Sequence, residues 1–184
     1  LDFIVNVVLD RELRPLAVAA GDVEAAHEEL VDFVRGYAAL PYPSQGDVLP
    51  DIIVTGPGEP LDINLYQSVK ALVGVEPFLR WLPSDDVAPR CAREGAGRQP
   101  VVVLLSRCWD GTGSEEMLEP FRKSGADVLA ALEASYTIEK DHSYFIARVN
   151  AHGTPIVACC PGVSDADLEV LGWRSAADPV AAFD

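Results

Sequence analysis

Three side chains with complementary polar chemistry lie in one short segment, at Tyr66, Gln67 and Lys70. At about 100° per residue on a helix, they fall on one side together with Ile63, opposite an apolar face. An ammonium group supplies charge, an amide both donates and accepts hydrogen bonds, and a phenol donates from an apolar ring. A site for a small, oxygen-rich anion could use all three, whereas an amphipathic helix does not need the grouping. Tyr66, Gln67 and Lys70 are therefore the candidate ligand-binding residues.

The helix expected to carry these residues covers Leu61 to about Arg80. A strand-like run, Asp51–Thr55, and a tight loop, Gly56–Glu59, precede it. Pro60 and Asp62 suit its first turn, where a missing N–H costs little and a carboxylate meets the positive end of the helix dipole. The residues predicted to form its apolar face are Leu65, Val69, Leu72 and Val73.

Beyond residue 50 the chain alternates apolar runs with helical stretches. Continuous β-branched runs are typical of strands buried on both faces. This alternation predicts an α/β fold, a three-layer sandwich with a mostly parallel sheet. The predicted strands are Asp51–Thr55, Pro100–Ser106 and Pro155–Cys160. The predicted later helices are Ser114–Ser135, Tyr136–Val149 and Asp165–Leu171, and the polar stretch Pro83–Gln99 is predicted to be a loop.

The first part of the chain has a different pattern. It predicts a short β-hairpin, Phe3–Leu9 and Pro15–Ala20, followed by a helix over Val23–Ala38 with Asp22 as its cap. Breaker-rich sequence then indicates a linker. The expected organisation is residues 1–40 as hairpin and helix, 41–49 as a linker or hinge, and 50–184 as the α/β domain.

The chain is strongly acidic. Its 184 residues include 14 Lys and Arg against 29 Asp and Glu, for a formal net charge of −15 at pH 7. Nucleic acids and anionic membranes are bound by basic patches, so neither is expected as a partner. No apolar stretch approaches the roughly 20 residues of a membrane span. An anionic ligand stays compatible, because Lys70 and nearby arginines could dominate the charge of one pocket.

The four cysteines give no metal-binding pattern. Cys91, Cys108, Cys159 and Cys160 contain no CxxC pair, and no histidine lies at ligand spacing from them. The adjacent Cys159 and Cys160 end an apolar run and are predicted to be buried thiols. A reducing, cytoplasmic compartment fits this usage best.

Three loops follow the predicted strands, where open α/β sheets bind their ligands. Gly56–Glu59 could hold an anion with backbone N–H groups, or could be only a tight turn. Arg107–Gly113 could shape and close a site, or could be a flexible connection with a packed Trp109. Pro161–Ser164 is the third loop.

The segment Pro60-Leu61-Asp62-Ile63-Asn64-Leu65-Tyr66-Gln67-x-x-Lys70-Ala71 resembles the signature of the C-terminal domain of the nickel-pincer-nucleotide-dependent lactate racemases. Further stretches are similar to that family. They are Asp2–Asp10, Ala20–Asp22 with Ala26-His27, and Asp110–Glu115.

The resemblance implies a racemase or epimerase of small 2-hydroxy acids such as lactate, working by hydride removal and return on a nickel-pincer nucleotide. That cofactor and the acid/base and nickel-binding histidines are expected on an N-terminal domain outside this chain. The equivalents of Gln67 and Lys70 face the interdomain cleft and hold the substrate carboxylate, while Tyr66 is either a site residue or a packed aromatic. Residues 1–40 could be the edge of that preceding domain.

The remaining expectations follow from these. The chain starts at Leu1 and is expected to be part of a longer protein, inactive by itself. His27 is expected to have a structural or interdomain role, His142 to be exposed and His152 to lie in a loop, so no metal site is predicted. Two alternatives stay open: a non-catalytic regulatory module that binds a small anion, and a domain whose Tyr66–Lys70 face contacts another protein.

Overall fold

The computed structural model describes residues 2–38, 50–79, 100–124 and 127–183. The chain divides into two compact units, Leu1–Tyr42 and Pro43–Asp184. The predicted linker 41–49, the predicted loop Pro83–Gln99 and Cys91 lie outside the described residues. No helix in the described part of the chain combines the length and the apolar composition needed to cross a membrane.

The first unit is a helix packed on a hairpin. Strands β1 (Ile4–Leu9) and β2 (Pro15–Gly21) pair antiparallel, with Val7 opposite Val18. Helix α1 (Val23–Ala38) follows, and Asp22 Oδ1 caps it by accepting from two backbone N–H groups of its first turn. The predicted hairpin, cap and helix are therefore confirmed.

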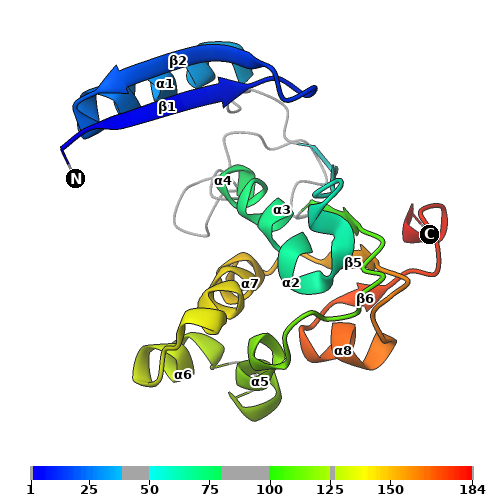
Figure 1. Ribbon diagram of the computed structural model, residues 1–184. Coiled ribbons are helices and arrows are strands. Elements are labelled where there is room, and N and C mark those ends of the chain that lie inside the picture. Colours follow the sequence, from blue (N-terminus) through cyan, green and yellow to red (C-terminus); the bar gives the residue numbers. More distant parts are fainter. Residues whose placement is uncertain (1, 39–49, 80–99, 125–126, 184) are drawn as a thin grey trace, which may run out of the picture. The chain divides into compact units, whose positions relative to one another are not determined.

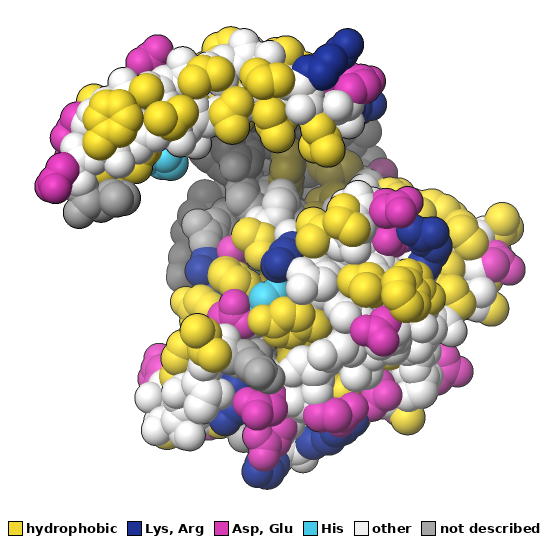
Figure 2. Space-filling view, in the orientation of Figure 1, with side chains coloured by type: hydrophobic (Ala, Val, Ile, Leu, Met, Phe, Trp, Pro, Cys, Tyr) yellow, Lys and Arg dark blue, Asp and Glu magenta, His cyan; other side chains and the backbone are white. Residues whose placement is uncertain are grey.

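Alternation along the two strands gives this unit two different faces. One face packs Ile4, Val8 and Ala17 against Ala26 and Leu30. The opposite face is apolar and exposed, and Figure 2 shows its hydrophobic side chains in yellow. The exposed residues on it are Phe3, Val5, Val7, Leu9, Leu16 and Val18.

A parallel sheet organises the second unit (Figure 1). Its strands are β3 (Ile52–Thr55), β4 (Val101–Leu105), β5 (Ile156–Cys159) and β6 (Arg174–Ser175), paired in that order. The first three confirm the predicted strands. Strand β6 is not predicted, because two residues are too few to carry a periodic pattern.

Helical segments connect the strands. Between β3 and β4 lie η1 (Leu61–Ile63), α2 (Leu65–Ser68), α3 (Lys70–Val73) and α4 (Glu76–Leu79). Between β4 and β5 lie α5 (Glu115–Ser124), α6 (Val128–Ala134), η2 (Ile138–Lys140) and α7 (Asp141–Ala151). Helix α8 (Asp165–Val170) and the turn η3 (Ala181–Phe183) follow β5 and β6.

The prediction of one helix from Leu61 to Arg80 is wrong. Asn64 has an extended backbone, with φ −149° and ψ 171°, and its side chain caps a new helix. Ile63 therefore does not share a helix face with Lys70, and Val73 is 38% exposed rather than buried. The predicted helix Ser114–Ser135 is likewise two helices, α5 and α6.

The core lies mainly on one side of the sheet. Parallel strands in sequential order, joined by right-handed crossovers, bring their connecting helices to the same face. Val102, Leu104 and Ile156 pack there with side chains from α2 through α8. On the other face, Val103 and Val157 belong to a smaller cluster. The predicted α/β fold with a parallel sheet, preceded in the chain by a hairpin and a helix, is confirmed, and the helical cover is concentrated on one face of the sheet.

Candidate functional site

Gln67 and Lys70 lie beside each other in the helical segments that follow β3. Asn64 Oδ1 accepts a 3.0 Å hydrogen bond from Gln67 N and so starts helix α2 at this point. Lys70 Nζ donates to Gln67 Oε1 at 2.6 Å, with Lys70 exposed and Gln67 half-buried. The two side chains thus form a small polar surface with a net positive charge, as the sequence predicts. Their role in binding stays a prediction.

The Tyr66 side chain contacts His142. The sequence predicts that His142 is exposed, and this prediction is wrong. His142 is 4% exposed, and its ring stacks on the Tyr66 ring with 3.8 Å between centroids and 29° between planes. Its Nδ1 lies 2.6 Å from Asp141 Oδ1. A polar sequence around His142 conceals this burial, since only the packing of α7 against the preceding helices turns the imidazole inward.

Backbone hydrogen bonds connect the loop Arg107–Gly113 to the start of α2. Gly111 O accepts from Leu65 N at 3.0 Å, and Thr112 O accepts from Tyr66 N at 2.9 Å. In the opposite direction, Cys108 N donates to Asp62 O at 2.8 Å. These contacts support a shaping role for the loop rather than a flexible connection. Trp109 is 67% exposed, whereas the alternative of a flexible connection predicts a packed Trp109.

The same bonds engage the backbone N–H groups at the start of α2. Leu65 N and Tyr66 N are bonded to the loop, and Gln67 N is bonded to Asn64. The first amides of α2 therefore have partners inside the protein. In the loop Gly56–Glu59, Gly56 permits close packing, because a Cβ on it would lie 2.5 Å from Leu105 O. Anion binding by the backbone of this loop stays a prediction.

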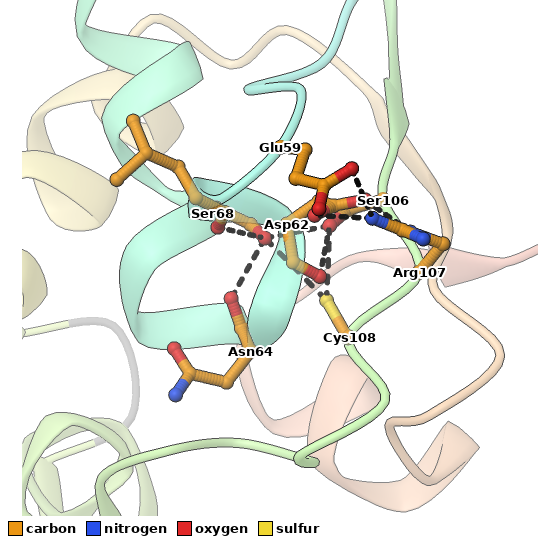
Figure 3. Close-up of polar contacts among 8 residues, drawn as sticks. Glu59, Asp62, Asn64, Ser68, Ser106, Arg107 and Cys108 are labelled. Atoms are coloured by element: carbon orange, nitrogen blue, oxygen red, sulfur yellow. Dashed lines mark hydrogen bonds and ion pairs between the residues drawn. The ribbon is translucent and has the colours of Figure 1, made fainter.

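An ion pair joins the first two loops (Figure 3). Arg107 Nε donates to Asp62 Oδ2 at 2.5 Å and its Nη2 to Asp62 Oδ1 at 3.1 Å, while Glu59 lies 3.6 Å from Nη2. The Arg107 hydrogen bond lowers the pKa of Asp62, and the same bond raises the pKa of Arg107. This arginine is engaged by carboxylates, which leaves Lys70 as the better cation for a ligand.

We expect Asp62→Asn to weaken the folded state in a pH-dependent way. Because the pKa of Asp62 is depressed in the folded protein, the pair stabilises it above the ordinary carboxyl range and stops doing so as the pH falls through the depressed pKa. The difference in Tm between wild type and Asp62→Asn should be largest near pH 7 and should shrink as the pH falls below the ordinary carboxyl pKa. Circular dichroism melts would measure it, with the exposed Glu116→Gln as control. A difference that does not change with pH would contradict this account.

A buried cluster of hydroxyls and a thiol lies next to Asp62 of the ion pair (Figure 3). Ser68 Oγ is 2.7 Å from Ser106 Oγ, and Cys108 Sγ is 3.3 Å from the latter. The Cys160 thiol lowers the pKa of Cys108 to about 6, and the same interaction with burial raises the pKa of Cys160. Cys108, Cys159 and Cys160 are all buried free thiols, which confirms the prediction for the last two. The cluster ties α2 to the end of β4, and the sequence does not reveal it, because its members are far apart along the chain.

The other two histidines lie on different units of the chain. His27 is exposed on α1 of the first unit, and His152 follows α7 with its Nε2 3.9 Å from Glu76 Oε1. Across residues 2–38, 50–79, 100–124 and 127–183, no three His, Cys, Asp or Glu side chains lie close enough together to hold a metal ion.

The fold and these contacts define a class of protein. A parallel sheet with polar loops at the carboxyl ends of its strands is typical of α/β domains that bind small ligands at that edge. Asp62, Gln67, Lys70 and Arg107 all lie in the segments that follow β3 and β4.

Comparison with known proteins identifies the family. The chain is 42% identical over 77 residues to the lactate racemase of Lactiplantibacillus plantarum, a match covering 41% of the chain and 17% of that protein. It is 30% identical over 124 residues to the lactate racemase of Thermoanaerobacterium thermosaccharolyticum, covering 67% and 24%. No family model matches the sequence.

A solved structure agrees in fold. The lactate racemase apoprotein from Thermoanaerobacterium thermosaccharolyticum superposes with a TM-score of 0.77 at 23% identity, covering 99% of this chain and 40% of that one. The chain belongs to the lactate racemase family, and it spans less than half the length of the relatives it matches.

Proposed function

We propose that this chain is the C-terminal domain of a nickel-pincer-dependent racemase of 2-hydroxy acids such as lactate, and that it binds the substrate carboxylate. The main support is the exposed Lys70–Gln67 pair, joined at 2.6 Å, in a chain related to lactate racemases. Tyr66, next in the chain to Gln67, completes the proposed carboxylate-binding face, which consists of Tyr66, Gln67 and Lys70.

The chemistry of the pair suits a carboxylate. The Lys70 ammonium has three N–H donors and uses one on Gln67 Oε1, so others can point to a ligand. The amide Nε2 of Gln67 has no partner among the described residues and offers two more donors. Charge-assisted hydrogen bonds of this kind are stronger than neutral ones. A carboxylate held by both side chains would be fixed in position and in orientation.

The residues of this chain do not fit the cofactor itself. A nickel-pincer nucleotide attached to a lysine would supply the hydride-accepting chemistry, but the lysines are only Lys70, Lys123 and Lys140. Lys70 bonds to Gln67, Lys123 and Lys140 both pair with Glu119, and the described residues hold no metal-binding cluster. We therefore place the cofactor on a separate N-terminal domain.

The first unit could contact that domain. The strands of residues 2–38 present an exposed apolar sheet face, and two-stranded sheets are marginally stable without further packing. The relatives have more chain than is present here, so we assign this face to the edge of the cofactor-binding domain.

The free thiols also fit the cytoplasmic location that we propose.

The decisive experiment uses the complete gene product, co-expressed with proteins that assemble the cofactor. It should bind nickel and interconvert D- and L-lactate, as followed by chiral chromatography. Residues 1–184 alone should bind no nickel and racemise nothing. Nickel loading without lactate turnover would keep the family chemistry but move the substrate to another 2-hydroxy acid. Absence of both, with carboxylate binding that depends on Lys70, would favour the regulatory anion-binding module.

A further inference from the structure

Asn64 connects the loop Arg107–Gly113 to the start of α2 through both ends of its side chain. Its Oδ1 accepts a 3.0 Å hydrogen bond from Gln67 N. Its Nδ2 donates to Asp110 Oδ2 at 3.2 Å. Because a backbone N–H only donates and an ionised carboxylate only accepts, the two partners fix which end of the amide faces which. A single side chain therefore bridges the loop after β4 and the first turn of α2.

The rest of Asn64 is held in place as well. Its carbonyl oxygen accepts from Ser68 N at 3.0 Å and from Ser68 Oγ at 2.7 Å (Figure 3). Its amide packs against Gly113, where a Cβ would lie 2.4 Å from Asn64 Cγ. The neighbouring backbone is bonded to the same loop, since Asp110 N donates to Ile63 O at 2.9 Å. These contacts leave the Asn64 side chain little room to adopt another rotamer.

The presence of asparagine at this position has a chemical reason. Asp, Ser, Thr and Asn all cap helices well, because each offers a side-chain oxygen to the N–H groups of the first turn. Among them, only asparagine has its acceptor and its donors on two different atoms. It can therefore bond to Gln67 N in one direction and to Asp110 in another. A cap alone would not need the second bond.

The cap bond leads directly to the proposed carboxylate-binding face. Gln67 N donates to Asn64, and Gln67 Oε1 accepts from Lys70 Nζ at 2.6 Å. A chain of three hydrogen bonds thus joins Asp110, Asn64, Gln67 and Lys70 in that order. Since both side chains proposed to bind the carboxylate follow Asn64 closely in the chain, a shift of the helix start would displace them together.

We infer that Asn64 is a positioning residue, whose bond to Asp110 fixes the start of α2 and with it the proposed carboxylate-binding face. Asn64 acts through Gln67 and does not touch the substrate. The inference rests on the proposed function of that face. Because the substrate carboxylate keeps its charge throughout the proposed reaction, faulty positioning should raise KM and leave kcat nearly unchanged.

A double-mutant cycle in the complete gene product tests this. Asn64→Asp keeps the cap oxygen but loses the donor, and it sets two carboxylates against each other where Nδ2 and Oδ2 now lie 3.2 Å apart. We expect KM for lactate to rise about fivefold, the size of one hydrogen bond, with kcat within about twofold of wild type. Asp110→Asn keeps an oxygen that accepts from Asn64 Nδ2, so both constants should stay within about twofold of wild type.

The double variant Asn64→Asp/Asp110→Asn restores the bond in the opposite direction. The new carboxylate accepts from Gln67 N and from the new amide in the loop, so KM should return to within about twofold of wild type. The charge next to Gln67 is the same as in the single variant Asn64→Asp. Recovery of KM therefore separates positioning from simple repulsion between that charge and the substrate. Circular dichroism melts of all four proteins would report any change in stability.

The kinetics of these proteins lead to distinct conclusions. An unchanged KM in Asn64→Asp, with only Tm lowered, would reduce Asn64 to a helix cap and overturn the inference. A raised KM that persists in the double variant would also overturn it, because charge near the substrate would then explain the effect. Either result leaves the proposed function standing if Lys70→Ala raises KM. Absence of 2-hydroxy-acid racemisation by the wild type, or equal KM values for wild type and Lys70→Ala, would refute the carboxylate-binding face, and the inference with it.

Discussion

In the complete gene product, replacing Lys70 with alanine is expected to lower kcat/KM for the proposed lactate racemisation on the order of 10- to 100-fold, because a hydrogen bond to a charged group contributes about 1.5–3 kcal/mol. The substrate carboxylate keeps its charge throughout the proposed reaction. Its interaction with Lys70 is therefore similar in ground and transition states, and the loss should fall mainly on KM. Initial rates over a range of D- and L-lactate concentrations would separate the two constants.

Lys123→Ala is the matched control for this experiment. Lys123 is also an exposed helical lysine bonded to a neighbour, in its case the Glu119 carboxylate, but it lies on α5. Its loss should leave kcat/KM within about twofold of wild type, since exposed ion pairs contribute little. Gln67→Ala should have a smaller effect than Lys70→Ala, because a neutral amide is lost. Equal kcat/KM values for wild type and Lys70→Ala would show that Lys70 does not bind the substrate.

Replacing Gly162 with alanine is expected to destabilise the α/β unit by at least about 3 kcal/mol, as severe overpacking does. A Cβ at Gly162 would lie 1.7 Å from Cys108 O and 2.4 Å from the carbonyl carbon. Both are backbone atoms of the loop that is bonded to the start of α2, so no side chain can rotate to make room. Tm should fall by roughly 6–12 °C for this size of domain.

Gly74→Ala is the control in the same unit. A Cβ there meets only Ala71 O, at an ordinary 3.5 Å, and Gly74 has a helical φ of −70°. Alanine should leave Tm unchanged or raise it slightly, because it restricts the unfolded chain. Thermal melts by circular dichroism would compare the two variants with wild type. A Gly162→Ala protein as stable as wild type would show that the loop can move away from Gly162.

The sequence by itself determined the features that depend on local physics. Short apolar runs and turn signals located β1 through β5, and Asp22 marked the start of α1, because caps and periodicity act over a few residues. The pairing of Gln67 with Lys70 is of the same kind, since residues three apart on a helix are neighbours. The family resemblance to lactate racemases also came from a contiguous motif, and the comparisons confirm it.

Only the tertiary structure decided how distant residues meet. The stacking of Tyr66 on His142, the ion pair of Asp62 with Arg107 and the pairing of β6 all join segments far apart along the chain. Asn64 caps a new helix within a segment whose apolar spacing predicts one continuous helix. A polar stretch such as the one around His142 carries no sign of burial, because burial depends on which element packs against it. The physical reason is that solvent exposure and side-chain partners are properties of packing, whereas a periodic pattern reports only which face of an element is apolar.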